Sequence, residues 1–308
     1  MESNKVKSQL IEVLRTAEKR FENLVNFPFS PKYIENLEGF EGMRLHYLDE
    51  GPNDSNFTFL CLHGQPTWSY LYRKMIPIFV NAEYRVIVPD YYGFGRSDKP
   101  IEEEVYTFEF HRNSIIAFIK YLQLKNIILV CQDWGGLIGL TLPMEMPTSF
   151  SKLILMNTTL GTGEGVPSQG FKGFRDWVNN TPDMDVGRLM LRGTSNLSPE
   201  DMKAYDAPFP DITYKAGIRR FPNLLPTTYD APGAEISRRA RDWFQKEWTG
   251  ESFMAIGMQD PVLGPSVMKK LREIIPGCPE PLKLKEAGHF VQEWGDIVAK
   301  KALESFNL

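Results

Sequence analysis

The chain contains the run Ile127-Ile128-Leu129-Val130-Cys131-Gln132-Asp133-Trp134-Gly135-Gly136, followed by the apolar residues 137–140. Its first four residues predict a buried strand, because short apolar runs of this kind lie inside sheets. Residues 132–135 predict a sharp turn, and the small residues that follow suit a helix packed on a sheet. A strand, a turn and a helix in this order would hold Asp133 in a strained conformation at the top of the sheet.

The residue at the centre of this turn determines its chemistry. In the related motif G-x-S-x-G the central serine attacks a carbonyl carbon and forms an acyl-enzyme. Here the central residue is Asp133, and Cys131 replaces the first glycine of that motif. A carboxylate attacks an sp3 carbon instead and forms an alkyl ester. The turn therefore predicts that Asp133 is a nucleophile.

Length and composition are typical of an ordinary globular protein. The 308 residues suffice for one large domain, or for a core with an inserted subdomain, and the net charge of −4 gives no reason to expect a nucleic acid or membrane partner. Three cysteines form no disulfide framework, which predicts reduced thiols and a cytoplasmic location. The N-terminus has no apolar run of signal-peptide length, so no secretory signal is expected.

Apolar runs alternate with helical patterns along most of the chain. This alternation predicts an α/β fold with a mostly parallel central sheet flanked by helices. Further strands are expected at residues 43–51, 57–62, 85–90, 152–157, 252–258 and 282–284, and helices at residues 5–24 and 107–122.

The alternation stops after Asn157. Residues 158–230 are rich in glycine, proline and aromatic side chains and contain no convincing buried strand. They are interpreted as an inserted helical cap that divides the core into residues 1–157 and 231–308. Ligands of open α/β sheets bind at the carboxyl ends of the strands, so a cap placed there would enclose an apolar pocket.

One of the four histidines is placed to act as a base. His289 lies close to the C-terminus, and Asp260, at the end of a predicted strand, is expected to orient its imidazole. The alternative position for the acid holds Asn157, which cannot serve as a carboxylate. The order nucleophile, acid, histidine is that of the α/β-hydrolase fold. His46 and His111 are interpreted as structural or solvent-facing, and His63 as a residue that orients a loop by hydrogen bonds.

Two backbone amides and two indoles complete the expected site. The N–H groups of Gln65 and Trp134 would form an oxyanion hole. The indole of Trp134, joined by Trp177 of the cap, would donate to a large, weakly hydrated anion such as bromide or chloride, although core packing explains Trp177 equally well. The expected pocket wall consists of Leu137, Phe171, Phe174, Phe221, Pro222, Leu225, Val262 and Leu263.

These residues resemble the motifs of the haloalkane dehalogenases, in particular the subfamily with the acid after the late strand and a second tryptophan in the cap. The resemblance covers most of the chain and is weakest over the N-terminal helix and residues 161–205. The motifs are residues 63–70, residues 90–100, Gln132-Asp133-Trp134-Gly135-Gly136, residues 253–257 and Ala287-Gly288-His289-Phe290-Val291-Gln292-Glu293.

The resemblance implies hydrolytic dehalogenation of small halogenated hydrocarbons to an alcohol, a halide ion and a proton. It implies Asp133, His289 and Asp260 as catalytic residues, and no metal or organic cofactor. Another subfamily binds halide through an asparagine at the position of Gln65, so the role of second halide ligand falls to Trp177. The protein is expected to be a monomer.

Alternative functions share much of this site. An epoxide hydrolase has the same Asp, His and Asp set but needs cap tyrosines as proton donors, for which Tyr205, Tyr214 and Tyr229 are candidates. A haloacid dehalogenase would need arginines beside Asp133, and none adjoins it in the sequence. A non-catalytic ligand-binding relative would be expected to lack at least one of the three catalytic residues.

Overall fold

The computed structural model describes residues 11–308. Eight strands form its central sheet, and they are β2 (Lys32–Ile34), β3 (Leu45–Glu50), β4 (Thr58–Leu62), β5 (Arg85–Pro89), β7 (Ile127–Gln132), β8 (Phe150–Met156), β9 (Glu251–Gly257) and β10 (Leu282–Leu284). Their order across the sheet is β10-β9-β8-β7-β4-β5-β3-β2. Only β3 runs opposite to the other seven strands of this sheet. The mostly parallel sheet expected from the sequence is confirmed.

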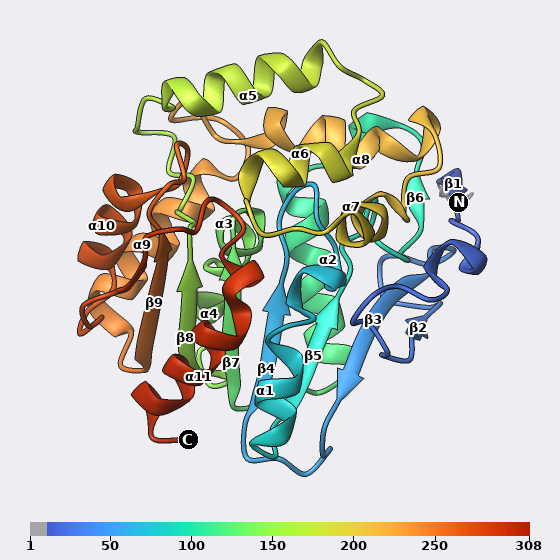
Figure 1. Ribbon diagram of the computed structural model, residues 1–308. Coiled ribbons are helices and arrows are strands. Elements are labelled where there is room, and N and C mark those ends of the chain that lie inside the picture. Colours follow the sequence, from blue (N-terminus) through green and yellow to red (C-terminus); the bar gives the residue numbers. More distant parts are fainter. Residues whose placement is uncertain (1–10) are drawn as a thin grey trace, which may run out of the picture.

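Helices cover both faces of this sheet. Figure 1 shows α1 and α11 in front of the strands and α2 behind them. The helices of the core are α1 (Ile76–Asn81), α2 (Phe108–Tyr121), α3 (Trp134–Gly139), α4 (Leu142–Glu145), α9 (Ala234–Glu247), α10 (Pro265–Ile274) and α11 (Gly295–Phe306). Short 3-10 helices include η2 (Ser69–Tyr72), η3 (Glu103–Val105) and η6 (Val291–Trp294). The helix expected at residues 107–122 is therefore found as α2.

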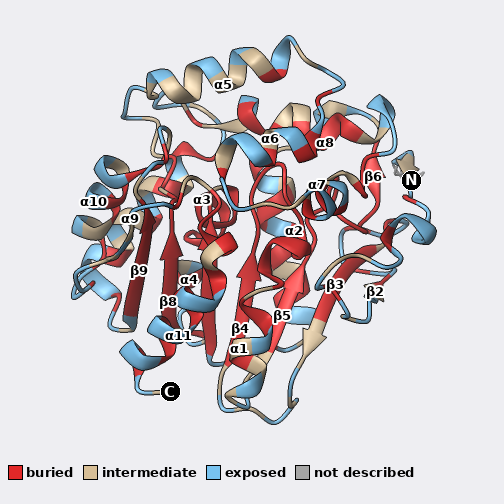
Figure 2. Cartoon of the chain, viewed as in Figure 1, coloured by how far each residue is buried: buried red, intermediate tan, exposed pale blue. Residues whose placement is uncertain are grey.

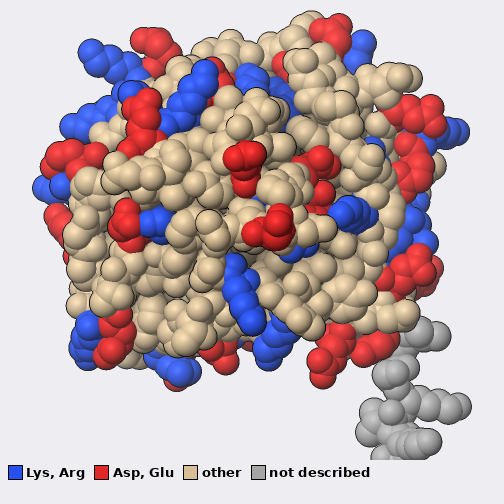
Figure 3. Space-filling view, turned by 90° about the horizontal axis from the view of Figure 1, so that it is seen from below, with Lys and Arg blue, Asp and Glu red and all other residues tan. Residues whose placement is uncertain are grey.

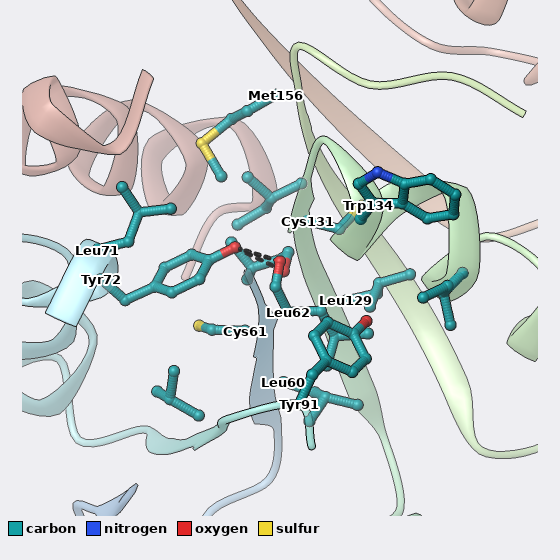
Figure 4. Close-up of a cluster of buried hydrophobic side chains, with 14 of the residues drawn as sticks. Leu60, Cys61, Leu62, Leu71, Tyr72, Tyr91, Leu129, Cys131, Trp134 and Met156 are labelled. Carbon is teal, nitrogen blue, oxygen red and sulfur yellow. Dashed lines mark hydrogen bonds between the residues drawn. The ribbon is translucent and has the colours of Figure 1, made fainter. Parts of the chain in front are cut away.

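The central strands lie in the hydrophobic core because their apolar runs are covered on both faces. Every residue of β4 and β7 is buried, and the strands are red along most of their length in Figure 2. Beneath the turn that follows β7, the hydroxyl of Tyr72 donates a 2.7 Å hydrogen bond to the Leu62 carbonyl at the end of β4 (Figure 4). This polar contact satisfies a strand end in an otherwise apolar region.

The segment between β8 and β9 inserts a layer of helices above the sheet (Figure 1). Its helices are α5 (Gln169–Asn179), α6 (Val186–Gly193), α7 (Pro199–Asp206), η4 (Ile212–Lys215), α8 (Ala216–Arg220) and η5 (Phe221–Leu224). Side chains at their N-termini fix where several begin, as Ser198 does by accepting a hydrogen bond from the Asp201 amide. We call this layer of helices the cap.

The N-terminal segment differs from its expected structure. Within the described part of residues 5–24 there is a strand, β1 (Val13–Leu14), and a 3-10 helix, η1 (Glu18–Phe21), but no α-helix, and residues 5–10 lie outside the described part. β1 pairs antiparallel with β6 (Lys99–Pro100), and the guanidinium of Arg15 makes 2.7 and 2.8 Å bonds to the carboxylate of Asp98. These tertiary contacts override the helical pattern of the sequence.

A buried ionic cluster ties the cap to the core. The guanidinium of Arg73, which follows η2, makes two 2.8 Å bonds to the Glu293 carboxylate in η6 and one to the Asp201 carboxylate in α7. The side chains of Arg73 and Glu293 are both fully buried. Tyr205 of α7 also donates to Glu293. Because Glu293 is four residues after His289, this cluster fixes the loop that carries the histidine.

On the outer surface, acidic and basic side chains are interspersed. Figure 3 shows this on the face opposite the cap, where Lys and Arg lie among Asp and Glu along the rim. Among the helices of residues 11–308, none is long and apolar enough to cross a membrane.

Candidate active site

The turn after β7 holds Asp133 in an unusual backbone conformation. Its φ of 51° and ψ of −127° lie in a region that non-glycine residues rarely adopt. Small neighbours make the turn possible, because a side chain at Gly135 would overlap the Leu62 carbonyl and one at Gly136 would overlap Thr158. Thr158 donates a 2.8 Å hydrogen bond to the Asp133 carbonyl. The sharp turn expected from the sequence is therefore present.

His289 lies between two carboxylates. Its Nδ1 is 2.7 Å from Oδ2 of Asp260, and its Nε2 is 3.5 Å from Oδ2 of Asp133. Asp260 also accepts a 2.8 Å bond from the Asn157 side chain and bonds from the amides of Val262 and Leu263. Asn157, which occupies the alternative position for the catalytic acid, is thus a hydrogen-bond partner of Asp260.

These contacts shift the pKa values of both members of the pair. Burial raises the pKa of the Asp260 carboxyl, but the imidazole of His289 and the donated hydrogen bonds outweigh burial and bring it down to about 2. Burial lowers the pKa of the His289 imidazole, but the carboxylates of Asp260 and Asp133 outweigh burial and raise it to about 10. The pair therefore favours a negative charge on Asp260.

The backbone amide of Gln65 faces the Asp133 carboxylate. Its N–H donates a 2.9 Å hydrogen bond to Oδ1 of Asp133. The side chain of Gln65 is held away from the carboxylate by a 3.1 Å bond from its Nε2 to the Ile218 carbonyl of the cap. Trp134, the other expected amide donor, is the first residue of α3, where helix N–H groups have no partner within the helix.

A cavity of about 420 Å³ lies between this cluster and the cap. Asp133, Asp260 and His289 line it from the core, and Phe171, Phe174 and Trp177 of α5 line it from the cap. The remaining lining residues are Gln65, Pro66, Trp134, Gly170, Leu189, Leu191, Arg192, Gly193, Thr194, Ser195, Pro222, Gln259, Pro261, Val262, Glu286, Gly288 and Phe290. Most of this lining is apolar, as in small-molecule sites.

The structure places four of the eight expected pocket-wall residues at the cavity. Phe171, Phe174, Pro222 and Val262 line the cavity, whereas Leu137, Phe221, Leu225 and Leu263 are not among its lining residues.

Packing explains three of these differences. Phe221 is fully buried beneath Trp134, with 5.0 Å between the ring centroids, so it supports the wall from behind. Leu137 turns toward Gly161, away from the cavity. Leu263 is buried, and its backbone amide donates a hydrogen bond to the Asp260 carboxylate.

Both expected indoles line the cavity. Within residues 11–308, neither Trp134 nor Trp177 donates its indole N–H to a protein acceptor. The guanidinium of Arg192 lies 5.3 Å from the ring centre of Trp177. Arg192 is exposed and has no ion-pair partner among the described residues, so the cavity carries a positive charge at its edge.

The sequence did not identify Arg192 or the contact that Gln132 makes with His289. Arg192 lies in the cap, where no motif marks the residues that face the cavity. Gln132 was recognised only as part of the turn, yet its side-chain nitrogen is 2.9 Å from Nε2 of His289. His46, His63 and His111 are all buried, which excludes the solvent-facing interpretation.

The tyrosines that an epoxide hydrolase would need do not reach the cavity. Tyr205 is fully buried and bonded to Glu293, Tyr229 is largely exposed, and neither these two nor Tyr214 is among the lining residues. Within the described residues, no group of three or more His, Cys, Asp or Glu side chains is placed to hold a metal ion.

Comparisons with known proteins agree with this geometry. The family model described as the α/β hydrolase fold matches residues 58–296. A haloalkane dehalogenase of Psychrobacter cryohalolentis is 44% identical, covering 94% of this chain and 96% of the relative. A haloalkane dehalogenase of Mycolicibacterium paratuberculosis is 39% identical, covering 92% of this chain and 94% of the relative.

A solved structure extends the agreement to three dimensions. The haloalkane dehalogenase DpaA of Paraglaciecola agarilytica NO2 is 52% identical, superposes with a TM-score of 0.95, and covers 97% of this chain and 100% of its own. That structure is described as tetrameric, so the monomer expected from the sequence has no support from this relative. Sequence, fold and relatives together show that the chain has the α/β-hydrolase fold and belongs to the haloalkane dehalogenases.

Proposed function

We propose that this haloalkane dehalogenase works in two half-reactions that both take place at Asp133. In the first, Oδ2 of Asp133 attacks the carbon that bears the halogen, while Oδ1 keeps its 2.9 Å hydrogen bond from the Gln65 amide. The carbon–halogen bond breaks, and the halide leaves with the electron pair. The enzyme is then an alkyl ester of Asp133.

The halide leaves toward the indoles of Trp134 and Trp177 in this proposal. Both indoles line the cavity, and their N–H groups have no protein acceptor within the described residues. An indole N–H is a donor without acceptor capacity, which suits a weakly hydrated anion in apolar surroundings. Both residues are therefore assigned as halide ligands.

The second half-reaction hydrolyses the ester. Nε2 of His289 removes a proton from a water molecule, and the hydroxyl oxygen adds to the ester carbonyl carbon. The amides of Gln65 and Trp134 stabilise the negative oxygen that forms, and Asp260 stabilises the imidazolium. The bond between this carbon and Oδ2 then breaks as the imidazolium of His289 returns its proton to Oδ2, which leaves in the alcohol. The oxygen of water replaces Oδ2 in Asp133, and the remaining proton is released to solvent as the carboxylate re-forms.

The observation that carries this proposal is the position of a carboxylate at the strained turn, 3.5 Å from Nε2 of His289 and bonded to a backbone amide. The direct test is halide release from 1,2-dibromoethane and 1-bromobutane by the wild type and by Asp133→Ala. Bromide release by the wild type alone is expected. Diol formation from an epoxide without bromide release would instead assign an epoxide hydrolase.

The fate of oxygen gives a second, sharper test. In a single turnover in water enriched in oxygen-18, the first alcohol should carry ordinary oxygen and the label should enter Asp133. Label in the first alcohol would mean that water attacks the substrate directly, which would overturn the covalent route.

A cytoplasmic location is part of the same proposal. Cys61, Cys131 and Cys278 are free and buried, as expected in a compartment that keeps thiols reduced. Fractionation of the native cells by compartment would test this, and recovery of the protein outside the cytoplasm would overturn it.

A further inference from the structure

The carboxamide of Gln132 is built into the surroundings of His289. Gln132 is the last residue of β7 and is fully buried. Its Nε2 lies 2.9 Å from Nε2 of His289 and also donates a 3.1 Å hydrogen bond to the His289 carbonyl. The same amide group therefore contacts both the ring and the backbone of one histidine.

The first of these contacts requires a particular form of the imidazole. Nδ1 of His289 carries its proton toward Oδ2 of Asp260 at 2.7 Å. At 2.9 Å, an amide N–H and Nε2 can form a hydrogen bond only if Nε2 offers its lone pair. The amide thus fits the neutral imidazole with its proton on Nδ1, which is the form that accepts a proton from water.

The orientation of the carboxamide is fixed by its second contact. Exchanging the oxygen and nitrogen would bring Oε1 of Gln132 against the His289 carbonyl, where two acceptors repel. In the orientation observed, Oε1 of Gln132 is buried without any hydrogen-bond partner in the described residues.

We propose that Gln132 is a positioning residue for the base, whose amide holds the Nε2 lone pair of His289 free of a proton while Asp133 is esterified. This inference rests on the proposed function, because it assigns a partner to the base of the second half-reaction. The water that His289 activates takes the place of the amide at Nε2. The bond to the His289 carbonyl keeps the carboxamide nearby.

The charges around His289 show why such a partner matters. The carboxylates of Asp260 and Asp133 both favour the imidazolium, and Glu286 and Arg192 line the same cavity. A hydrogen bond donated to the neutral imidazole lowers the pKa of His289, whereas the carboxylates raise it. Once Asp133 is esterified it has no charge, so Asp260 and the amide of Gln132 are then the groups in direct contact with the ring.

The test compares two substitutions at this position with a matched control. Gln132→Met removes the N–H group, and Gln132→Glu keeps the shape but replaces the donor with an acceptor. Gln292→Met is the control, because Gln292 is also fully buried, also has an unpaired Oε1, and bonds to Tyr72 instead of the ring. Decay of the ester on Asp133 is followed by intact-protein mass after a single turnover of 1,2-dibromoethane, as a function of pH.

The expected result is a shift of the pH midpoint for ester hydrolysis to higher pH. Gln132→Met should raise it by about one pH unit, the size of one ordinary hydrogen bond, and Gln132→Glu should raise it further. The rate of the first halide release should be unchanged, since the base takes no part in that step. Gln292→Met should leave the midpoint at the wild-type value.

Each other outcome has a definite meaning. Equal midpoints in the wild type and both Gln132 variants, or an equal shift in Gln292→Met, would overturn the role of Gln132 and leave the proposed function intact. A wild type that forms no ester on Asp133 would overturn the proposed function itself, and with it the inference.

Discussion

Replacing Arg73 with methionine should destabilise the protein strongly. The substitution supplies an apolar side chain of similar length. It removes two 2.8 Å bonds from the fully buried Glu293 carboxylate, which retains its ion pair with Lys74, and one bond from Asp201. Breaking a buried ion pair on one side costs about 3–5 kcal/mol. An unfolding entropy of about 2.1 cal/mol/K per residue over 308 residues gives about 0.65 kcal/mol/K, so Tm should fall by roughly 5–8 °C.

Thermal unfolding followed by calorimetry or circular dichroism measures this change. The control is Lys301→Met, which breaks the exposed pair with Glu304 and should change stability by no more than about 0.5 kcal/mol. The double variant Arg73→Met with Glu293→Met should lose less than the sum of the single losses, because no buried carboxylate that has lost its Arg73 bonds remains at position 293. A loss below about 1 kcal/mol for Arg73→Met alone would refute the view that this cluster holds the cap and the His289 loop together.

Four further predictions concern the site. His289→Phe should release one equivalent of halide and retain the alkyl group on Asp133, with turnover lowered by about 10²–10⁴-fold; no first-turnover halide would contradict the assigned roles. Folding lowers the pKa of Asp260 from 3.8 to about 2. This contributes about 2 kcal/mol of stability above the unfolded pKa, which is lost as pH falls through the folded value. The free energy of unfolding, measured with urea, should therefore fall less steeply with decreasing pH in Asp260→Asn than in the wild type. An equally steep fall in both proteins would contradict this. Trp177→Phe should weaken inhibition by bromide about ten-fold or more, since a hydrogen bond to an ion is lost; unchanged inhibition would leave Trp177 as a packing residue. Arg192→Gln should weaken the same inhibition about two- to five-fold, because the positive charge over the Trp177 ring is lost and an exposed cation–π contact contributes an energy of that size. Tighter bromide binding by this variant would show that Arg192 does not support bromide binding.

The parts of the fold that the sequence predicted are those with strong local patterns. The strand before Asp133 is an uninterrupted apolar run, and a run of that kind has few alternatives to burial inside a sheet. The turn after it requires glycine at residues 135 and 136, which restricts the backbone to a close passage against β4. His289 and Asp260 could be proposed from the sequence because the chain has few histidines and few acidic residues that follow a predicted strand in the required order.

The parts that the sequence did not predict depend on contacts between distant segments. The N-terminal segment has a helical pattern, yet Arg15 pairs with Asp98 and β1 joins β6. In the pocket wall, Leu137 and Phe171 are both apolar residues of helices, and only packing determines that Phe171 lines the cavity while Leu137 turns toward Gly161. The direction in which each of these side chains points is determined by packing in the folded core, so it cannot be predicted from the sequence of one helix.

The N-terminal segment has a consequence for how the protein is made. Its residues leave the ribosome well before their partners: Val13 pairs with Pro100, Thr16 donates to the Pro208 carbonyl, and Arg20 donates to the Ala207 carbonyl. The segment therefore cannot dock while it is being translated, and it must wait until the chain has been extended past the end of α7. Docking of residues 13–20 then marks the point at which core and cap have come together, so this segment is among the last to reach its native position.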